Sequence, residues 1–240
     1  MLEELKNKIK IGIIPARLHS TRISKKILVD INGKPMVIHT ADQISKCNNL
    51  DKLIIAIDNN ETYEALKDFE YELIMTSKHH NSGTDRIAEV IKEKYNADII
   101  INIQADEPFI NPTIIDKLVE AFNNPEIEMC TLISNQLSVK DLDDESIVKT
   151  YIDENLYAID FVRIIHNHSL TRLGGIYKHL GIYGFTKETL LKYISYKQTV
   201  NEKSRSLEQM RALDNGIKIK TIITDQDSLS INTKFDLNKI

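Results

Sequence analysis

The chain has 240 residues, of which 42% are hydrophobic and 28% are charged. These proportions are typical of a globular protein that buries one substantial core. The formal net charge of −4 argues against a general nucleic-acid binder, and no segment approaches the roughly 20 apolar residues that a membrane span requires. The charged N-terminal segment contains no apolar run typical of a secretory signal. We therefore expect a cytoplasmic protein with neither a nucleic-acid nor a membrane partner.

Short apolar runs alternate with longer amphipathic stretches through the first half of the chain. The pattern predicts strands over 10–14, 52–57, 72–75, 98–103 and 129–133, and helices over 36–47, 61–69, 84–95 and 112–122. Pro112 and Thr84 are residue types that favour helix starts. Alternation of apolar strands with helices indicates an α/β protein with a mainly parallel, doubly wound sheet.

The second half of the chain is less regular. Strands over 146–151 and 156–161 flank a turn-like Asp-Glu-Asn triplet and predict a hairpin. A mobile loop over 163–178, a strand over 179–185, helices over 187–195 and 203–215, a strand over 217–223 and a helix over 233–240 follow. Because no linker or repeat interrupts the pattern, we predict a single domain over 1–240, with an insertion around 146–185. The distant Cys47 and Cys130 are interpreted as reduced core thiols.

A cluster of cations follows the first predicted strand. Arg17, Arg22, Lys25 and Lys26 lie within ten residues that contain no acid. In an open α/β sheet, ligands bind at the carboxyl ends of the strands, and converging Arg and Lys side chains favour a polyphosphate. The loop has no glycine and the chain has no P-loop motif, so side-chain cations are expected to hold the phosphates. The alternative is that these cations are solvated surface charges.

An acid follows the fourth predicted strand. Asp106 lies in the segment QADEP at 104–108, where a carboxylate is well placed to hold Mg²⁺ against phosphate oxygens. The alternative is a turn or N-cap acid that precedes the helix at Pro112. An acid beside a cationic loop favours metal-assisted nucleotidyl transfer.

Motifs along the chain resemble those of the 3-deoxy-manno-octulosonate cytidylyltransferases, or CMP-Kdo synthetases. The matching segments, in order, are PAR at 15–17, STR at 20–22, NGKPM at 32–36, SGTDR at 82–86, QADEP at 104–108, VK at 148–149, HLGIYGF at 179–185 and LEQMR at 207–211. The resemblance spans essentially the whole chain. It implies a Rossmann-like nucleotide-diphospho-sugar transferase fold, with a mainly parallel sheet and a β-hairpin insertion, and a homodimer.

The resemblance also implies a reaction and a site. The reaction is transfer of CMP from CTP to 3-deoxy-D-manno-octulosonate (Kdo), with release of pyrophosphate, for lipopolysaccharide or capsule synthesis. The nucleotide would be bound by Arg17, Arg22, Lys26, Ser82, Gly83, Arg86 and Gln104. The acidic sugar would be bound by Gln104, Arg163, His179, Tyr183, Glu208 and Gln209. Mg²⁺ would be held by Asp106 and Asn232, and the catalytic residues would be Arg17, Lys26 and Asp106.

The match departs from the family at three places. The family's late Val-Asp-Thr motif reads Ile231-Asn232-Thr233 here, which replaces a metal-binding carboxylate by a neutral amide. The segment AIDFVR at 158–163 replaces Leu-Tyr-Phe-Ser-Arg, and SKKI at 24–27 replaces Pro-Gly-Lys-Pro. These changes leave open another anionic acceptor, such as an amino-substituted octulosonate or a phosphonate, or a CTP-binding protein without turnover.

Two predicted sugar contacts also have structural alternatives. His179 could be a hydrogen-bonded core or edge histidine. Glu208 and Arg211 could be an i,i+3 pair on a helix surface.

Overall fold

The computed structural model describes residues 8–20, 23–165, 175–227, 230–231 and 234–237. Its strands are β1 (Lys10–Ala16), β2 (Asp30–Ile31), β3 (Lys34–Pro35), β4 (Lys52–Ile57), β5 (Glu72–Met75), β6 (Ile99–Asn102), β7 (Met129–Ser134), β8 (Lys149–Ile152), β9 (Ala158–Val162), β10 (Ile176–Thr186) and β11 (Lys220–Thr224). Its helices are α2 (Met36–Ile44), α3 (Asn60–Leu66), α4 (Gly83–Glu93), α5 (Pro112–Glu120), α6 (Lys187–Ser195), α7 (Val200–Arg205), α8 (Met210–Asp214) and α9 (Lys234–Leu237). Short 3₁₀ turns are η1 (Lys26–Leu28), η2 (Ala121–Asn123) and η3 (Val139–Leu142).

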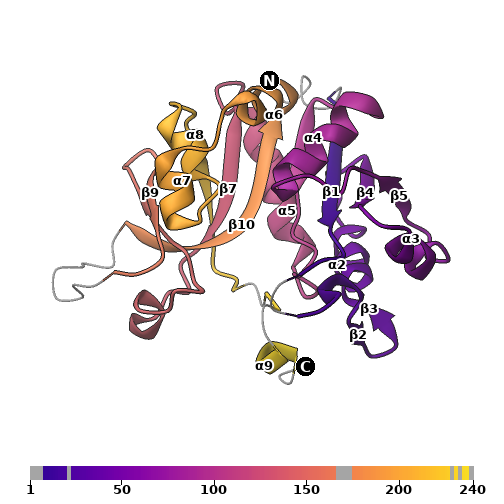
Figure 1. Cartoon of the computed structure of the whole chain (residues 1–240). Helices are drawn as coiled ribbons and strands as arrows, with labels where there is room; N and C mark the ends of the chain where they lie inside the picture. Colours follow the sequence, from indigo (N-terminus) through magenta and orange to yellow (C-terminus); the bar gives the residue numbers. More distant parts are fainter. Residues whose placement is uncertain (1–7, 21–22, 166–174, 228–229, 232–233, 238–240) are drawn as a thin grey trace.

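One large sheet organises the molecule (Figure 1). Its strand order is β11-β7-β10-β6-β1-β4-β5, and β8 and β9 extend it from β10. Strand β1 pairs in parallel with β4 and β6, β4 pairs in parallel with β5, and β7 with β11. Strand β10 runs antiparallel to β6, β7 and β8. The predicted α/β class with a mostly parallel central sheet is confirmed.

The predicted hairpin is also present. Strands β8 and β9 pair antiparallel, with an irregularity in register between Tyr151 and Ile152. The Asp153 carboxylate closes the turn by accepting hydrogen bonds from the backbone amides of Asn155 and Tyr157, at 2.9 and 2.8 Å. A short polar side chain thus fixes the turn, as the Asp-Glu-Asn triplet predicts.

Helices cover both faces of the sheet because its strands are apolar on both sides. One core contains Ile38 of α2, Leu66 of α3 and Ile115 of α5. The other contains Ile87 of α4 and Leu190 of α6. Such two-sided burial requires strands with nearly continuous apolar runs, which is the pattern that predicted them.

The predicted single helix over 203–215 is wrong. Helix α7 ends at Arg205, and Ser206 adopts a left-handed conformation with φ of 52°. The chain then turns, and α8 begins at Met210. Because a helix cannot continue through a left-handed residue, this break separates two short helices and places Leu207 in the core.

Other boundaries differ less. Strand β10 begins at Ile176, inside the stretch predicted as a mobile loop, because Ile176 already pairs with Tyr151 of β8. Residues 166–174 of that loop lie outside the described residues. Strand β11 starts at Lys220 instead of 217, although Ile217 is buried.

Both cysteines are free thiols, as predicted. Burial, together with nearby Asp116, raises the pKa of Cys47 to about 12. Burial raises the pKa of Cys130 above its usual range as well. Both groups are therefore protonated at neutral pH.

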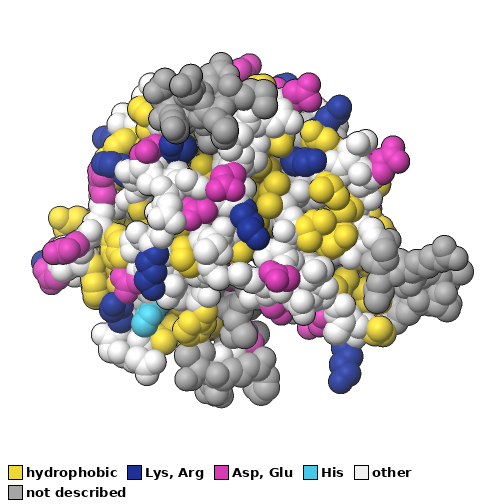
Figure 2. Space-filling view, turned by 180° about the vertical axis from the view of Figure 1, so that it is seen from behind, with side chains coloured by type: hydrophobic (Ala, Val, Ile, Leu, Met, Phe, Trp, Pro, Cys, Tyr) yellow, Lys and Arg dark blue, Asp and Glu magenta, His cyan; other side chains and the backbone are white. Residues whose placement is uncertain are grey.

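The surface opposite the view of Figure 1 has mixed character. Figure 2 shows single Lys, Arg, Asp and Glu side chains interspersed with apolar ones over this face. Among the described residues, no helix is both long and apolar enough to cross a bilayer.

Gly184 of β10 gives a test of the packing. A Cβ there would lie 2.7 Å from a ring carbon of Phe122 and 2.9 Å from the sulfur of Cys130. Because a rigid ring cannot retreat, we expect Gly184→Ala to lower the free energy of unfolding by about 2 kcal/mol in a denaturant titration. The control is Gly12→Ala, whose closest new contact is the Leu50 Cδ1 methyl group at 2.9 Å. That side chain can move, so the loss should be smaller; equal losses would contradict the prediction.

Candidate active site

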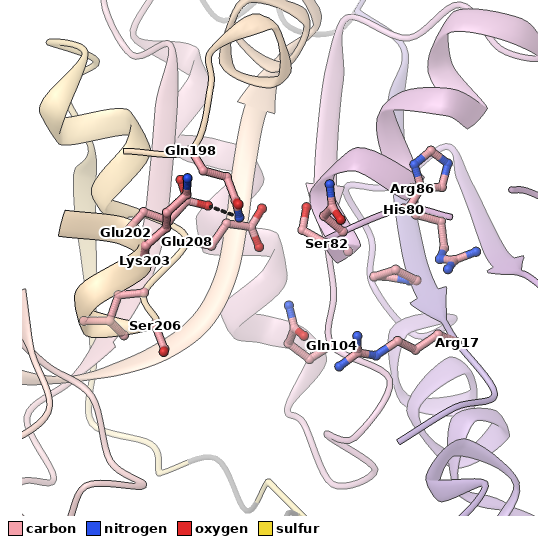
Figure 3. A pocket seen from close by; sticks show the side chains of 14 residues that line it. Arg17, His80, Ser82, Arg86, Gln104, Gln198, Glu202, Lys203, Ser206 and Glu208 are labelled. Carbon is pink, nitrogen blue, oxygen red and sulfur yellow. Dashed lines mark hydrogen bonds between the residues drawn. The ribbon is translucent and has the colours of Figure 1, made fainter. Parts of the chain in front are cut away.

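A cavity of about 550 Å³ opens at the carboxyl ends of β1 and β6 (Figure 3). The N-terminal end of α4 forms one wall, and α7 with the turn that follows it forms the other. The lining residues are Pro15, Arg17, His80, Asn81, Ser82, Gly83, Arg86, Gln104, Gln198, Glu202, Lys203, Ser206, Leu207 and Glu208. The volume lies within the range of pockets that hold small-molecule ligands.

Arg17 and Gln104 come from neighbouring strand ends. Arg17 directly follows β1 and is exposed, and its loop is held by a hydrogen bond of 3.0 Å from the Leu18 amide to Asp58 Oδ1. Gln104 follows β6 and donates from Nε2 to the carbonyl of Gly181 at 3.1 Å. Both side chains reach the cavity in Figure 3, so two residues predicted to bind the nucleotide lie at one site.

Ser82 and Gly83 form the start of α4. The Ser82 side chain accepts a hydrogen bond from the Asp85 amide at 3.0 Å and caps the helix. Gly83 packs against Pro15, whose ring would lie 3.1 Å from an added Cβ. The positive end of an eleven-residue helix thus faces the cavity, where it favours an anionic group.

Arg86 is held in the protein interior. Its guanidinium donates to Asp58 Oδ2 at 3.1 Å, to Thr76 Oγ1 at 2.5 Å and to the carbonyl of Ser77 at 3.2 Å. Burial lowers its pKa. These bonds give Arg86 a structural role in the cavity wall, while its predicted contact with the nucleotide stays a prediction.

Lys26 and Asp106 form an ion pair; neither residue lines the cavity, although Asp106 follows the lining residue Gln104 by two positions. The distance from Lys26 Nζ to Asp106 Oδ2 is 2.5 Å, and the two side chains are 12% and 23% exposed. The Asp106 carbonyl accepts a hydrogen bond of 3.0 Å from the Ile231 amide, so the C-terminal segment lies against this strand end. The predicted ligands Arg22 and Asn232 lie outside the described residues. Lys25 instead pairs with Glu61 at the surface, half exposed.

Glu107 is an additional acid that the sequence did not assign. Its side chain is buried, and burial together with the neighbouring Asp106 raises its pKa well above the usual value. Its place directly after Asp106 is the only sequence signal that could have drawn attention to it.

Glu208 lies in the break between α7 and α8 and lines the same cavity as Ser82. Its carboxylate interacts with the Thr84 and Ser82 side chains, and burial raises its pKa. The alternative of an i,i+3 surface pair with Arg211 is wrong, because the Arg211 guanidinium binds Glu202 through two hydrogen bonds of 2.9 and 2.5 Å. The neighbouring Gln209 is buried, at 6% exposure.

His179 and Tyr183 project from β10 into an aromatic cluster. The His179 ring lies 5.0 Å from Phe161 and 5.3 Å from Tyr183, and its Nε2 lies 3.1 Å from Thr131 Oγ1. Burial lowers the pKa of His179 to about 3 and raises that of Tyr183. Neither residue lines the cavity, so their predicted role in sugar binding stays a prediction.

Arg163 ties three backbone segments together. Its guanidinium donates to the carbonyls of Glu145, Arg205 and Ser206 at 2.9, 3.2 and 2.9 Å. It therefore stabilises the left-handed end of α7. A contact with the sugar carboxylate, as predicted, would require it to exchange some of these bonds.

Sequence reasoning missed part of the cavity wall. His80 and Asn81 precede the capping Ser82, and Gln198, Lys203 and Ser206 belong to α7 and its flanks. The capping box formed by Thr199 and Glu202 was readable as Thr-x-x-Glu and could have located α7. That α7 lies at the cavity depends on tertiary packing, which no local sequence pattern predicts.

The comparisons with known proteins agree with this architecture. Residues 11–219 match a protein family described as Cytidylyltransferase. A solved structure of CMP:2-keto-3-deoxy-manno-octonic acid synthetase complexed with CTP superimposes with a TM-score of 0.89, at 32% identity over 96% of both chains. The fold and the sequence together define a nucleotidyltransferase of the cytidylyltransferase class.

Curated relatives identify the family within the cytidylyltransferase class. The 3-deoxy-manno-octulosonate cytidylyltransferase of Trichlorobacter lovleyi is 38% identical over 95% of this chain and 96% of its own. That of Fusobacterium nucleatum is 39% identical over 96% of this chain and 94% of its own. The chain belongs to the 3-deoxy-manno-octulosonate cytidylyltransferase family.

The low pKa of His179 predicts a pH-dependent stability. Between pH 6.5 and about 3 the unfolded chain binds a proton that the folded His179 does not, so stability falls as the pH falls. We expect His179→Gln to reduce the difference in free energy of unfolding between pH 7.5 and pH 5 by at most about 2 kcal/mol. Denaturant titrations at both pH values measure this difference, and an unchanged difference would show that folding does not lower the pKa of His179.

Proposed function

We propose that this protein transfers CMP from CTP to Kdo and releases pyrophosphate. The observation that carries the proposal is that Arg17 and Ser82 of the nucleotide segments line the same cavity as Glu208 of the sugar segment. The curated relatives are named for this reaction, and the superimposed synthetase was solved with CTP.

The cavity supplies complementary groups for the two substrates. Arg17 and the N-terminal end of α4 attract the triphosphate, and Glu208 accepts hydrogen bonds from sugar hydroxyls. The anomeric oxygen of the sugar then forms a bond to the α-phosphorus, while the bond from that phosphorus to the bridging oxygen breaks. The hydroxyl proton leaves to solvent, and the protein's contribution is alignment and charge stabilisation.

The residues at the end of β6 fit a magnesium ion. Asp106 offers a partly exposed carboxylate two residues after the lining Gln104, and Mg²⁺ commonly uses one or two carboxylates together with substrate phosphates. Among the described residues no three acidic, His or Cys side chains cluster as a complete metal cage, and Asp227 is paired with Lys178. By the resemblance, Asp106 and Asn232 would hold the ion together with the triphosphate, and the ion would supply positive charge to the departing pyrophosphate.

The reaction is tested directly by following pyrophosphate release from CTP, Kdo and Mg²⁺. We expect turnover by the wild-type protein and a loss of at least about 100-fold in Asp106→Asn, because the amide removes the ligand charge. Circular dichroism should show that the variant is folded. Near-normal activity of Asp106→Asn would remove the metal role from Asp106.

An acceptor panel separates the alternatives. Turnover with an amino-substituted octulosonate or a phosphonate, but not with Kdo, would replace the acceptor and keep the class. CTP binding without pyrophosphate release from any acceptor would support a non-catalytic role.

The Lys26–Asp106 ion pair predicts that Lys26 lowers the affinity of Asp106 for the metal. Mg²⁺ and the Lys26 ammonium compete for the same carboxylate, and the triphosphate offers Lys26 another partner. In the absence of nucleotide, we expect Lys26→Gln to bind Mn²⁺ about 10-fold more tightly than the wild type, measured by calorimetry. Lys25→Gln is the matched control, because it removes the neighbouring lysine from its surface pair with Glu61. Equal Mn²⁺ affinity in all three proteins would show that Lys26 does not compete with the metal.

The resemblance further supports a cytoplasmic homodimer that activates a sugar for lipopolysaccharide or capsule synthesis. The dimer is proposed to involve the insertion around 146–185. Light scattering on the purified protein tests it, and a mass equal to one chain would exclude a dimer at that concentration.

A further inference from the structure

Glu208 lines the cavity although it lies in a turn and not in a helix or strand. The preceding Ser206 is left-handed, and the following helix starts only at Met210. A carboxylate in such a turn has no regular helix to orient it. Contacts from outside the turn must therefore set its position.

Tyr193 makes such contacts from α6. Its hydroxyl donates to the Glu208 carbonyl at 2.9 Å and lies 3.3 Å from Glu208 Oε1. One hydroxyl thus contacts both the backbone and the side chain of Glu208. Tyr193 is 1% exposed and does not line the cavity, so it reaches the substrate only through Glu208.

The Tyr193 ring is itself fixed. The Arg211 guanidinium lies over it at 4.9 Å from the ring centroid, and the Phe185 ring lies 6.0 Å away. Arg211 is anchored by Glu202, whose carboxylate also caps α7 through the Thr199 amide. Because ring and partners are buried together, the hydroxyl is pre-organised toward Glu208.

We propose that Tyr193 is a positioning residue, which orients the Glu208 carboxylate toward the acceptor sugar and favours its ionised form. The identity of that acceptor rests on the proposed function. The contact between Tyr193 and Glu208 exists without any substrate.

The effect on ionisation follows from the groups around Glu208. Burial raises the pKa of Glu208 most, and Asp85 of α4 raises it too, while Thr84 and Ser82 of the α4 wall and Arg211 of α8 favour the charged carboxylate. Tyr183 of β10 faces it as a further titratable group. A hydrogen bond from Tyr193 to the carboxylate favours the charged form. Removing only this hydroxyl leaves these other groups in place, so a change in the pKa of Glu208 reports the Tyr193 contact.

The test compares two tyrosines that each donate to a carboxylate. Tyr193→Phe keeps the ring and removes the hydroxyl. Tyr71→Phe is the matched control, because the Tyr71 hydroxyl donates to Asp42 Oδ1 at 2.6 Å and does not contact the cavity. The Glu208 carboxyl is titrated by carbon-13 NMR in the ligand-free protein, with its signal assigned by its loss in Glu208→Gln.

In Tyr193→Phe, we expect the pKa of Glu208 to rise by about half a unit or more. We also expect kcat/KM for the acceptor to fall about 10-fold, with its acid limb moved to higher pH and the KM for CTP unchanged. Tyr71→Phe should leave all three quantities at their wild-type values. In a Glu208→Ala background, Tyr193→Phe should have no further effect on kcat/KM.

Two results would overturn the proposal. One is an unchanged pKa of Glu208 in Tyr193→Phe; the other is a fall in kcat/KM that persists in the Glu208→Ala background. Should Tyr193→Phe not fold, replacement of Tyr193 by 3-fluorotyrosine, a stronger donor of similar size, must instead lower the pKa of Glu208. Failure of the wild type to use Kdo would reject the proposed function, while the NMR titration would still decide the role of Tyr193.

Discussion

Strand β10 is the constraint on which the two walls of the cavity depend. It is inserted antiparallel between β6 and β7, and its first residues also pair with β8. Its register with β7 shifts between His179 and Tyr183, and Gly181 in that interval has φ of 73°. The freed Gly181 carbonyl accepts the hydrogen bond from Gln104, so the irregularity in one strand orients a side chain at the end of another.

Two buried ion pairs fix short segments of the chain relative to each other. Asp58 with Arg86 fixes the loop after β4 to α4, and Glu202 with Arg211 fixes α7 to α8. Such pairs contribute little net stability compared with apolar residues, but removing one partner leaves a costly unpaired charge. They therefore act mainly on geometry. In both cases the anchored segment forms part of the cavity wall.

The sequence predicted best those elements whose signals are local. Strand β4 and helix α6 occur at their predicted residues, because continuous apolar runs and capping residues define them without reference to the rest of the chain. The break at Ser206 was missed, since the left-handed conformation depends on carbonyls held by the distant Arg163. The resemblance of the chain's motifs to the family placed Arg17, Ser82, Gln104 and Glu208 at one site. It could not reveal that Arg163 binds backbone carbonyls, because those carbonyls are distant in sequence. Contacts between side chains far apart in sequence produce no periodic pattern from which they could be predicted.

The two protonated thiols have a practical consequence. Thiol reagents attack the thiolate, and with a pKa of about 12 only a minute fraction of Cys47 carries that form at neutral pH; the fully enclosed Cys130 is still less reactive. A single cysteine introduced on each wall of the cavity could thus carry a fluorescent dye without prior removal of the native ones. The packing of the two native thiols thus leaves them nearly unreactive toward a dye intended for cysteines on the cavity walls.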